Sequence, residues 1–232
     1  MLSVLVNTGT VILGSLIGLL LKKGIPQKVT NAVMVAIGLC TLYIGIDGTL
    51  SGENSLVAII AMALGTIIGT AIDIDGGLNR LSVWVEKKAK KSDGQTSIAE
   101  GFLTGSLLFC IGAMTIVGSL NAGLSGDNSM IFTKSTLDFV SSMMLSASLG
   151  IGVMLAAAFV FVFQGAIVLL AQYLEPVLTS SAIAEITCVG SLMIIALGLN
   201  LIGITKIKVS NFLPAIILAP IVCWVFSLFG TI

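Results

Sequence analysis

Two residues of opposite charge, Lys134 and Asp138, stand four positions apart in a hydrophobic segment that also contains several serines: Ser135, Ser141, Ser142, Ser146 and Ser148. Residues four apart share one face of a helix, so the two charges can pair. Charges at or inside membrane segments are costly and usually mark a partner or a solute pathway. One interpretation is an ion pair at the membrane surface. The other is that Lys134 guards an anion entrance and Asp138 holds it in place.

Other polar residues end apolar segments and complete the candidate substrate-binding set: Glu100, Asn121, Glu185 and Asn200. Asparagine offers both a donor and an acceptor without a charge. For Asn121 and Asn200, helix capping or interhelical bonding is the alternative to solute coordination. We predict that a subset of the six residues lines a water-filled cavity near a helix break at Gly150 and Gly152.

The sequence offers no constellation for catalysis, a metal ion or a cofactor. It has no histidine, the commonest metal ligand and neutral-pH base, so its serines lack the partner that activates a nucleophile. Its four cysteines stand singly in apolar runs, and no GxxxxGK[ST] phosphate loop occurs. Acid–base chemistry by Glu100 and Glu185 would need them together, yet we expect them toward opposite membrane faces. We therefore predict a protein that is not an enzyme.

The composition indicates a chain solvated by lipid. Hydrophobic residues make up 56% of it, charged residues 9%, and the mean hydropathy is +1.14. A soluble domain of this length could not bury that much apolar surface. The net charge of zero gives no indication of nucleic acid binding. The N-terminus has no basic region or obvious cleavage site, so we interpret it as the first span.

Eight hydrophobic segments of roughly spanning length predict an all-α, polytopic transmembrane helix bundle in one domain, residues 1–232. The segments are 2–21, 29–47, 55–74, 98–120, 135–150, 152–174, 182–204 and 210–229. Residues 78–91 place apolar side chains at helical spacing opposite basic ones, which favours an amphipathic helix in the membrane interface.

The distribution of Lys and Arg predicts the topology. Eight crossings place only Lys134 on one side of the membrane, and on the other side Lys22, Lys23, Lys28, Arg80, Lys87, Lys88, Lys90, Lys91, Lys206 and Lys208. Basic loops stay in the cytoplasm, so both termini are predicted outside. Seven crossings, with 135–150 re-entrant, would turn Lys206 and Lys208 outward.

Internal repeats divide the chain into units of about 1–75, 97–150 and 151–232. Residues 37–55 align without gaps on 111–129, with eight of nineteen positions identical. The pattern AExxxxGSL occurs at 99–107 and at 184–192, in segments of opposite predicted direction. Inverted repeats are typical of secondary transporters. The glycine pairs Gly14/Gly18 and Gly65/Gly69 suit close helix packing, and from them we predict a homo-oligomer, with a dimer favoured.

Several stretches carry a resemblance that covers nearly the whole chain. They are GSLLFCIGAMTIVGSLNAGLSGD at 105–127, FTKSTLD at 132–138, SLGIG at 148–152 and GLNLIGITKIKVSNFLPAIILAPI at 198–221. With these residues the chain resembles the domain of unknown function 554 family of bacterial membrane proteins. The resemblance implies a polytopic protein of the cytoplasmic membrane. It implies little about activity, although transport is the usual interpretation.

Taken together, these features predict a secondary transporter or facilitator of a small solute or ion, without a cofactor. A passive ion channel is one alternative. A non-transporting scaffold or regulatory protein is the other, with the basic segment 78–91 binding anionic lipid or a cytoplasmic partner. The expected partners are the lipid bilayer, the solute and a second copy of the chain, and not nucleic acid.

Overall fold

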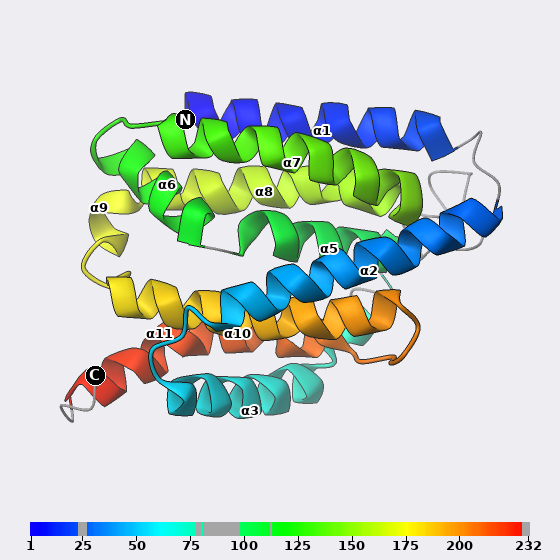
Figure 1. The fold of residues 1–232 in the computed structure, drawn as a ribbon. Coiled ribbons are helices and arrows are strands. Elements are labelled where there is room, and N and C mark those ends of the chain that lie inside the picture. Colours follow the sequence, from blue (N-terminus) through cyan, green and yellow to red (C-terminus); the bar gives the residue numbers. More distant parts are fainter. Residues whose placement is uncertain (23–26, 78–79, 81–97, 112, 229–232) are drawn as a thin grey trace.

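The computed structural model describes residues 1–22, 27–77, 80, 98–111 and 113–228, and its described part contains helices and no strands (Figure 1). The elements are α1 (Leu2–Lys22), α2 (Gln27–Thr49), α3 (Ser55–Ile72), α5 (Ile98–Cys110), α6 (Ala113–Leu124), α7 (Ser129–Leu149), α8 (Ile151–Leu169), α9 (Ala171–Leu174), α10 (Ser180–Leu201), η1 (Val209–Phe212) and α11 (Leu213–Leu228). The predicted all-α bundle is therefore confirmed. The predicted interfacial helix over 78–91 lies outside the described residues, apart from Arg80.

Five helical stretches are long and apolar enough to cross a membrane: Leu2–Leu21, Ser55–Ile72, Ile151–Leu169, Ser180–Leu201 and Val209–Leu228. A sixth candidate is the α5–α6 pair, which is bent by 59° at its break. The 23-residue α2 and the 21-residue α7 are more polar, but each packs along a spanning helix, α10 and α1 respectively. At 1.5 Å per residue, both reach across a hydrocarbon core of roughly 30 Å. The structure thus contains five to six candidate spans by length and composition, and the eight-crossing arrangement, which also needs α2 and α7, stays a prediction.

Glycines set the register of the closest helix pairs. A Cβ added at Gly14 would lie 2.3 Å from the backbone oxygen of Phe139, and one added at Gly18 would lie 2.2 Å from that of Met143. Helices α1 and α7 therefore run parallel with their backbones in contact. In the same way Gly65 meets Ala215 and Gly69 meets Asn211, so α3 and α11 run antiparallel.

These contacts change what the glycine pairs imply. Gly14/Gly18 and Gly65/Gly69 do mediate backbone packing, as predicted, but the packing lies within one chain. Their faces are already covered, so they give no support to an interface with a second copy. The homo-oligomer stays a prediction.

A single glycine, Gly150, separates α7 from α8, as the sequence predicts. Its φ of 79° and ψ of −155° suit a residue without a Cβ. Next to it, a Cβ at Gly152 would lie 2.3 Å from the backbone oxygen of Ile98, so α8 starts against the first turn of α5. This break forms the turn between two full-length helices, at one end of the bundle (Figure 1).

The aligned repeat at 37–55 and 111–129 ends in equivalent loops at one end of the bundle (Figure 1). In the first loop, the side chain of Asn54 accepts the backbone N–H of Leu56 at 3.0 Å and caps α3. In the second, Asp127 Oδ1 accepts the backbone N–H of Ser129 at 3.0 Å and its hydroxyl at 2.6 Å. These bonds hold the pKa of Asp127 below its usual value. The two loops start helices by related but different caps.

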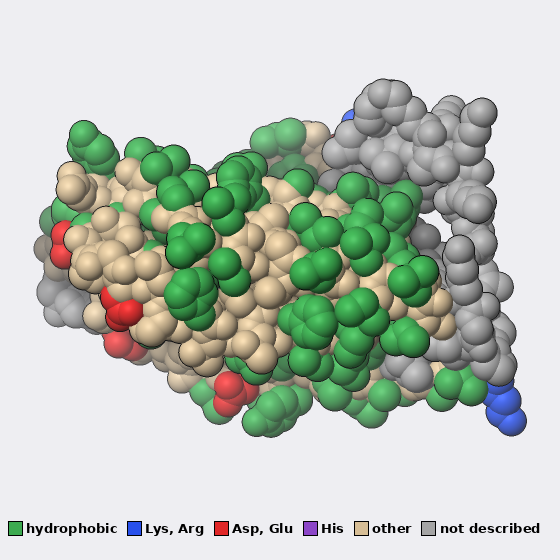
Figure 2. All heavy atoms as spheres, turned by 90° about the horizontal axis from the view of Figure 1, so that it is seen from above, with side chains coloured by type: hydrophobic (Ala, Val, Ile, Leu, Met, Phe, Trp, Pro, Cys, Tyr) green, Lys and Arg blue, Asp and Glu red, His purple; other side chains and the backbone are tan. Residues whose placement is uncertain are grey.

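Exposed charges separate along the bundle, with red carboxylates gathered toward one end and blue cations at the other (Figure 2). Four exposed acids occupy the loop end where the chain termini also lie, Asp47, Glu53, Asp127 and Glu175, whereas the exposed Asp73 lies at the opposite end and pairs with Arg80 at 3.9 Å. Described cations lie at the opposite end, in the loops or helix starts that contain Lys28, Arg80, Lys206 and Lys208. The split agrees with the predicted arrangement for every described cation except Lys134, which is buried.

Close packing of α1 on α7 yields a matched pair of stability predictions. Gly14→Ala should destabilise the protein by about 1–3 kcal/mol, because the new methyl group meets backbone that cannot move aside cheaply. Gly9→Ala, on the same helix, meets nothing within 4 Å and should be neutral or stabilising by up to about 1 kcal/mol. Unfolding in detergent micelles would measure both. Equal stability of the two variants would contradict the packing described.

Candidate functional site

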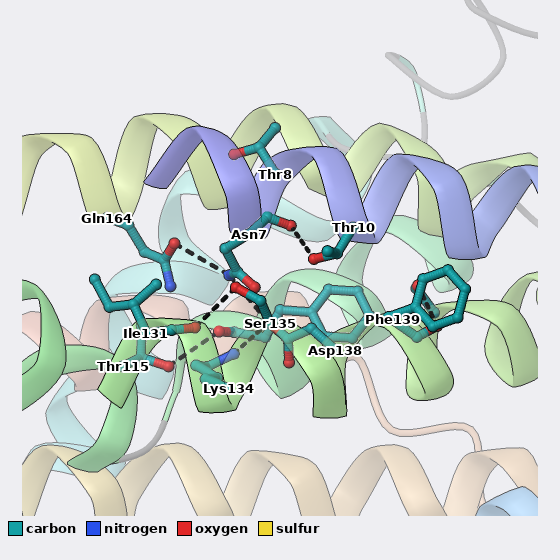
Figure 3. Close-up of polar contacts among 12 residues, drawn as sticks. Asn7, Thr8, Thr10, Thr115, Ile131, Lys134, Ser135, Asp138, Phe139 and Gln164 are labelled. Atoms are coloured by element: carbon teal, nitrogen blue, oxygen red, sulfur yellow. Dashed lines mark hydrogen bonds and ion pairs between the residues drawn. The ribbon is translucent and has the colours of Figure 1, made fainter. Parts of the chain in front are cut away.

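A buried group of polar side chains lies where α1, α7 and α8 meet, and we call it the α1–α7–α8 cluster: Asn7, Lys134, Asp138 and Gln164 (Figure 3). Lys134 and Asp138 are only 6% and 5% exposed, and they form an ion pair on one face of α7. The predicted i,i+4 pairing is therefore confirmed. Both side chains are enclosed by neighbouring helices, and their depth in the membrane stays a prediction.

The side-chain amide of Asn7, on α1, links the ion pair on α7 to Gln164 on α8. The Nδ2 group of Asn7 donates to Asp138 Oδ2 and to Gln164 Oε1, each at 3.1 Å. Asn7 and Gln164 are both 0% exposed. Asp138 Oδ2 thus accepts from the ammonium of its own helix and from the amide of α1, and the same amide nitrogen of Asn7 extends the link to α8.

The depth of the cluster follows from the position of Asp138 in α7. Asp138 is the tenth residue of the 21-residue helix Ser129–Leu149, which places it about 14 Å from the start of α7 and about 16 Å from its end. It therefore lies near the middle of α7. Removing one partner of a buried pair leaves an uncompensated charge and typically costs about 3–5 kcal/mol. The ammonium and the amide are what make the carboxylate tolerable at this depth.

Hydrogen bonding in the cluster is incomplete. Asn7 Oδ1 and Gln164 Nε2 are buried without a hydrogen-bond partner, and so are the hydroxyls of Ser3 and Ser15 on the same helix as Asn7. Each buried polar atom left unpaired costs about 1–3 kcal/mol. A bound group that supplied the missing partners would stabilise the cluster, which is the property expected of a binding site.

The broken span α5–α6 adjoins the cluster. Helix α5 ends at Cys110, which lies close enough to Lys134 and Asp138 to interact electrostatically with both. Across the break, the hydroxyl of Thr115 donates to the backbone oxygen of Phe109 at 3.1 Å. The last turn of a helix presents unpaired carbonyl oxygens, which favour a positive charge nearby. A helix end of this kind next to Lys134 gives the ammonium a second favourable environment.

Glu185 occupies a separate site on α10 and is 1% exposed. Its Oε1 accepts the backbone N–H groups of Glu53 and Asn54, at 2.8 and 2.7 Å, just before α3. The carboxylate therefore caps the N-terminus of α3, where the helix dipole favours a negative charge. Its Oε2 has no partner. A groove of about 640 Å³ lies beside it, between the α2–α3 loop and Cys188 of α10.

Asn200 closes the loop between α10 and η1. Its Nδ2 donates to the backbone oxygen of Ile207 at 2.8 Å, while its Oδ1 accepts from the hydroxyl of Thr205 and the backbone N–H of Ile207. These bonds use the whole amide for structure, which is the alternative that the sequence left open. Asn121 is half-buried near the end of α6, and Glu100 is half-buried in the first turn of α5.

Of the six predicted residues, the structure thus brings together Lys134 and Asp138, and leaves the others apart from them. The predicted place of the site needs correction as well. Asp138 is twelve residues from Gly150 on α7, about 18 Å along the helix, so the cluster lies nearer the α5–α6 break. Grooves of about 840 and 640 Å³ both lie along α3, and no cluster residue lines them.

Lys134 also cannot guard an anion entrance in this structure, because its ammonium is buried and paired. The surface at that end of the bundle carries exposed carboxylates instead (Figure 2). Sequence reasoning missed Asn7 and Gln164, which are uncharged. A search for amide side chains in the interior of spanning segments would have found both. Within the described residues, no group of three or more His, Cys, Asp or Glu could hold a metal ion.

The fold and the cluster define an all-helical, polytopic membrane protein with a charged centre. Residues 2–224 match the family model described as "Protein of unknown function (DUF554)", and the chain belongs to this family. It is 35% identical to "Uncharacterized membrane protein YdfK" of Bacillus subtilis over 99% of each chain. It is 30% identical to "Uncharacterized protein YqgA" of Escherichia coli over 92% of each chain. No solved structure matches. The family predicted from the sequence is confirmed.

The capping role of Glu185 leads to a stability prediction. Glu185→Ala should lower the free energy of unfolding by about 2–4 kcal/mol, because two buried N–H groups lose a charged acceptor. Glu185→Gln keeps an acceptor oxygen and should cost less. The matched control is Glu175→Ala, at an exposed position. Denaturation in detergent would rank the three variants, and a Glu185→Ala variant as stable as the control would exclude the cap.

Proposed function

We propose that this protein is a secondary transporter or facilitator that moves a small solute or ion across the bacterial cytoplasmic membrane. One observation carries the proposal: an ion pair and two amides, all buried, lie together inside three long, mostly apolar helices. A structural bundle gains nothing from this arrangement, because apolar residues would fill the same space at lower cost. A polar centre with unpaired atoms is useful when a solute must bind there.

The direction of the helices supports an inverted-repeat organisation. Helices α2 and α3 run antiparallel to α10 and α11, and α1 runs antiparallel to α8 because it is parallel to α7. The first three spans therefore have directions opposite to the last three. In such transporters the site lies between the halves, near the midplane, and opens alternately to each side. The cluster contains residues from both the first and the last part of the chain, as this organisation requires.

Transport would depend on the Asp138 carboxylate. Purified wild-type protein would first be screened by thermal unfolding against metabolites and salts, since a ligand that binds the folded state stabilises it increasingly as the ligand concentration rises. Transport of the solute found would then be measured in proteoliposomes. Asp138→Asn keeps the shape and removes the charge, and we expect it to lose at least tenfold in transport rate. Asp127→Asn changes an exposed carboxylate and serves as the control.

If Asp138→Asn folds and transports as well as the control, the cluster is structural and the proposal is wrong. The same holds if no solute binds or crosses, an outcome that would favour a non-transporting membrane scaffold. Uptake without saturation would instead indicate a passive channel.

The proposed orientation places both chain termini outside and the basic end in the cytoplasm. We expect a single cysteine introduced by Lys206→Cys to react only from the cytoplasmic side, and one introduced by Asp127→Cys only from outside. A membrane-impermeant thiol reagent applied to intact cells, in a background without native cysteines, would measure this. Labelling of both sites from the same side would contradict the eight-crossing arrangement.

A further inference from the structure

Three helices contribute buried oxygen atoms to the α1–α7–α8 cluster. They are the carboxylate of Asp138, Oδ1 of Asn7 and Oε1 of Gln164, on side chains that are 5%, 0% and 0% exposed, and Asp138 Oδ2 and Gln164 Oε1 both lie 3.1 Å from Nδ2 of Asn7. Carboxylate and amide oxygens are the ligands that hard cations take in proteins. The cluster contains one carboxylate and no second acid, so a single positive charge balances it. This donor set suits a monovalent cation better than a divalent one.

In this structure the single positive charge is the ammonium of Lys134, on the same helix as Asp138. Resting on the function proposed above, we propose that Asp138, Asn7 and Gln164 form a binding site for a small monovalent metal cation such as Na⁺ or K⁺. The Lys134 ammonium is the tethered competitor for this site. A cation that displaces it leaves the carboxylate paired with one positive charge, as before.

The unpaired Oδ1 of Asn7 is a second, independent observation. This acceptor is fully buried, and the ammonium of Lys134 does not engage it, although Nδ2 of the same amide makes two hydrogen bonds. The lysine therefore fills the site incompletely. A metal cation between Asp138 and Asn7 would be bound by both oxygens, which the lysine does not achieve.

The end of α5 would attract the displaced ammonium of Lys134. The end of α5 at Cys110 lies within electrostatic reach of Lys134, and terminal helix carbonyls attract a cation. Cys110 itself, the last residue of α5, is a titratable residue that interacts electrostatically with the Lys134–Asp138 pair. Outside the bundle, the end that carries Asp47, Glu53, Asp127 and Glu175 raises the local concentration of cations. Both features favour exchange at Asp138.

The test removes the competitor. Lys134→Met leaves the Asp138 carboxylate without its ammonium partner. The thermal unfolding temperature of this variant should therefore rise with NaCl or KCl and not with N-methyl-D-glucamine chloride of equal ionic strength. Wild-type protein should show the same selectivity with a smaller shift. Lys134→Met with Asp138→Asn should lose the response. Asn7→Leu, added to Lys134→Met, should weaken the apparent cation affinity at least tenfold. Lys206→Met, which removes an exposed lysine, is the control and should behave as wild type.

Lys134→Arg covers the case in which Lys134→Met does not fold. It keeps the ion pair with a permanently charged group, and it should abolish the wild-type response. Equal shifts with Na⁺, K⁺ and N-methyl-D-glucamine, in Lys134→Met or else in wild type, would overturn the proposal. The cation site and the transport function fail separately. Selective cation binding without transport of any solute would support the cation site and contradict the transport function. Transport without a cation response would support the transport function and contradict the cation site.

Discussion

The ion pair between Lys134 and Asp138 imposes the main constraint on this bundle. Two charges inside a helix bundle solvated by lipid must be enclosed by protein, since lipid offers no hydrogen bonds. Helix α1 and helix α8 provide that enclosure and contribute the amides of Asn7 and Gln164. The carboxylate thereby links α7 to α1, and the amide of Asn7 links α1 to α8.

Glycines make the enclosure possible. At Gly14 and Gly18 the backbone of α1 contacts that of α7, so no side chain keeps the two helices apart. Short polar side chains can then reach across the interface, as Asn7 does to Asp138. The glycines that the sequence offered as sites of oligomerisation are thus used to build the polar centre. In this part of the chain, the same glycines allow both the close packing of α1 on α7 and the hydrogen bond from Asn7 to Asp138.

Patterns of neighbouring residues in the sequence predicted the features of the fold that depend on neighbouring residues alone. The apolar segments gave the spans, the spacing of Lys134 and Asp138 gave their pairing, and the glycine at position 150 gave the turn between α7 and α8. Contacts between distant segments could not be derived in this way. Asn7 and Gln164 are 157 residues apart, and Glu185 caps a helix that starts 130 residues earlier. The role of Asn200 depends on how its loop folds back, which the residue type alone leaves open.

The two buried acids, Glu185 and Asp138, have different partners, and the kind of partner distinguishes a carboxylate that stabilises the fold from one that suits a binding site. Glu185 is held by backbone N–H groups, which are fixed in place and cannot be exchanged without unfolding the start of α3. Asp138 is held by a lysine on a flexible four-carbon chain and by the amide of Asn7. A fixed partner suits a carboxylate that stabilises the fold. A partner on a flexible chain suits the exchange proposed at Asp138, and among the described residues this partner distinguishes Asp138 from Glu185.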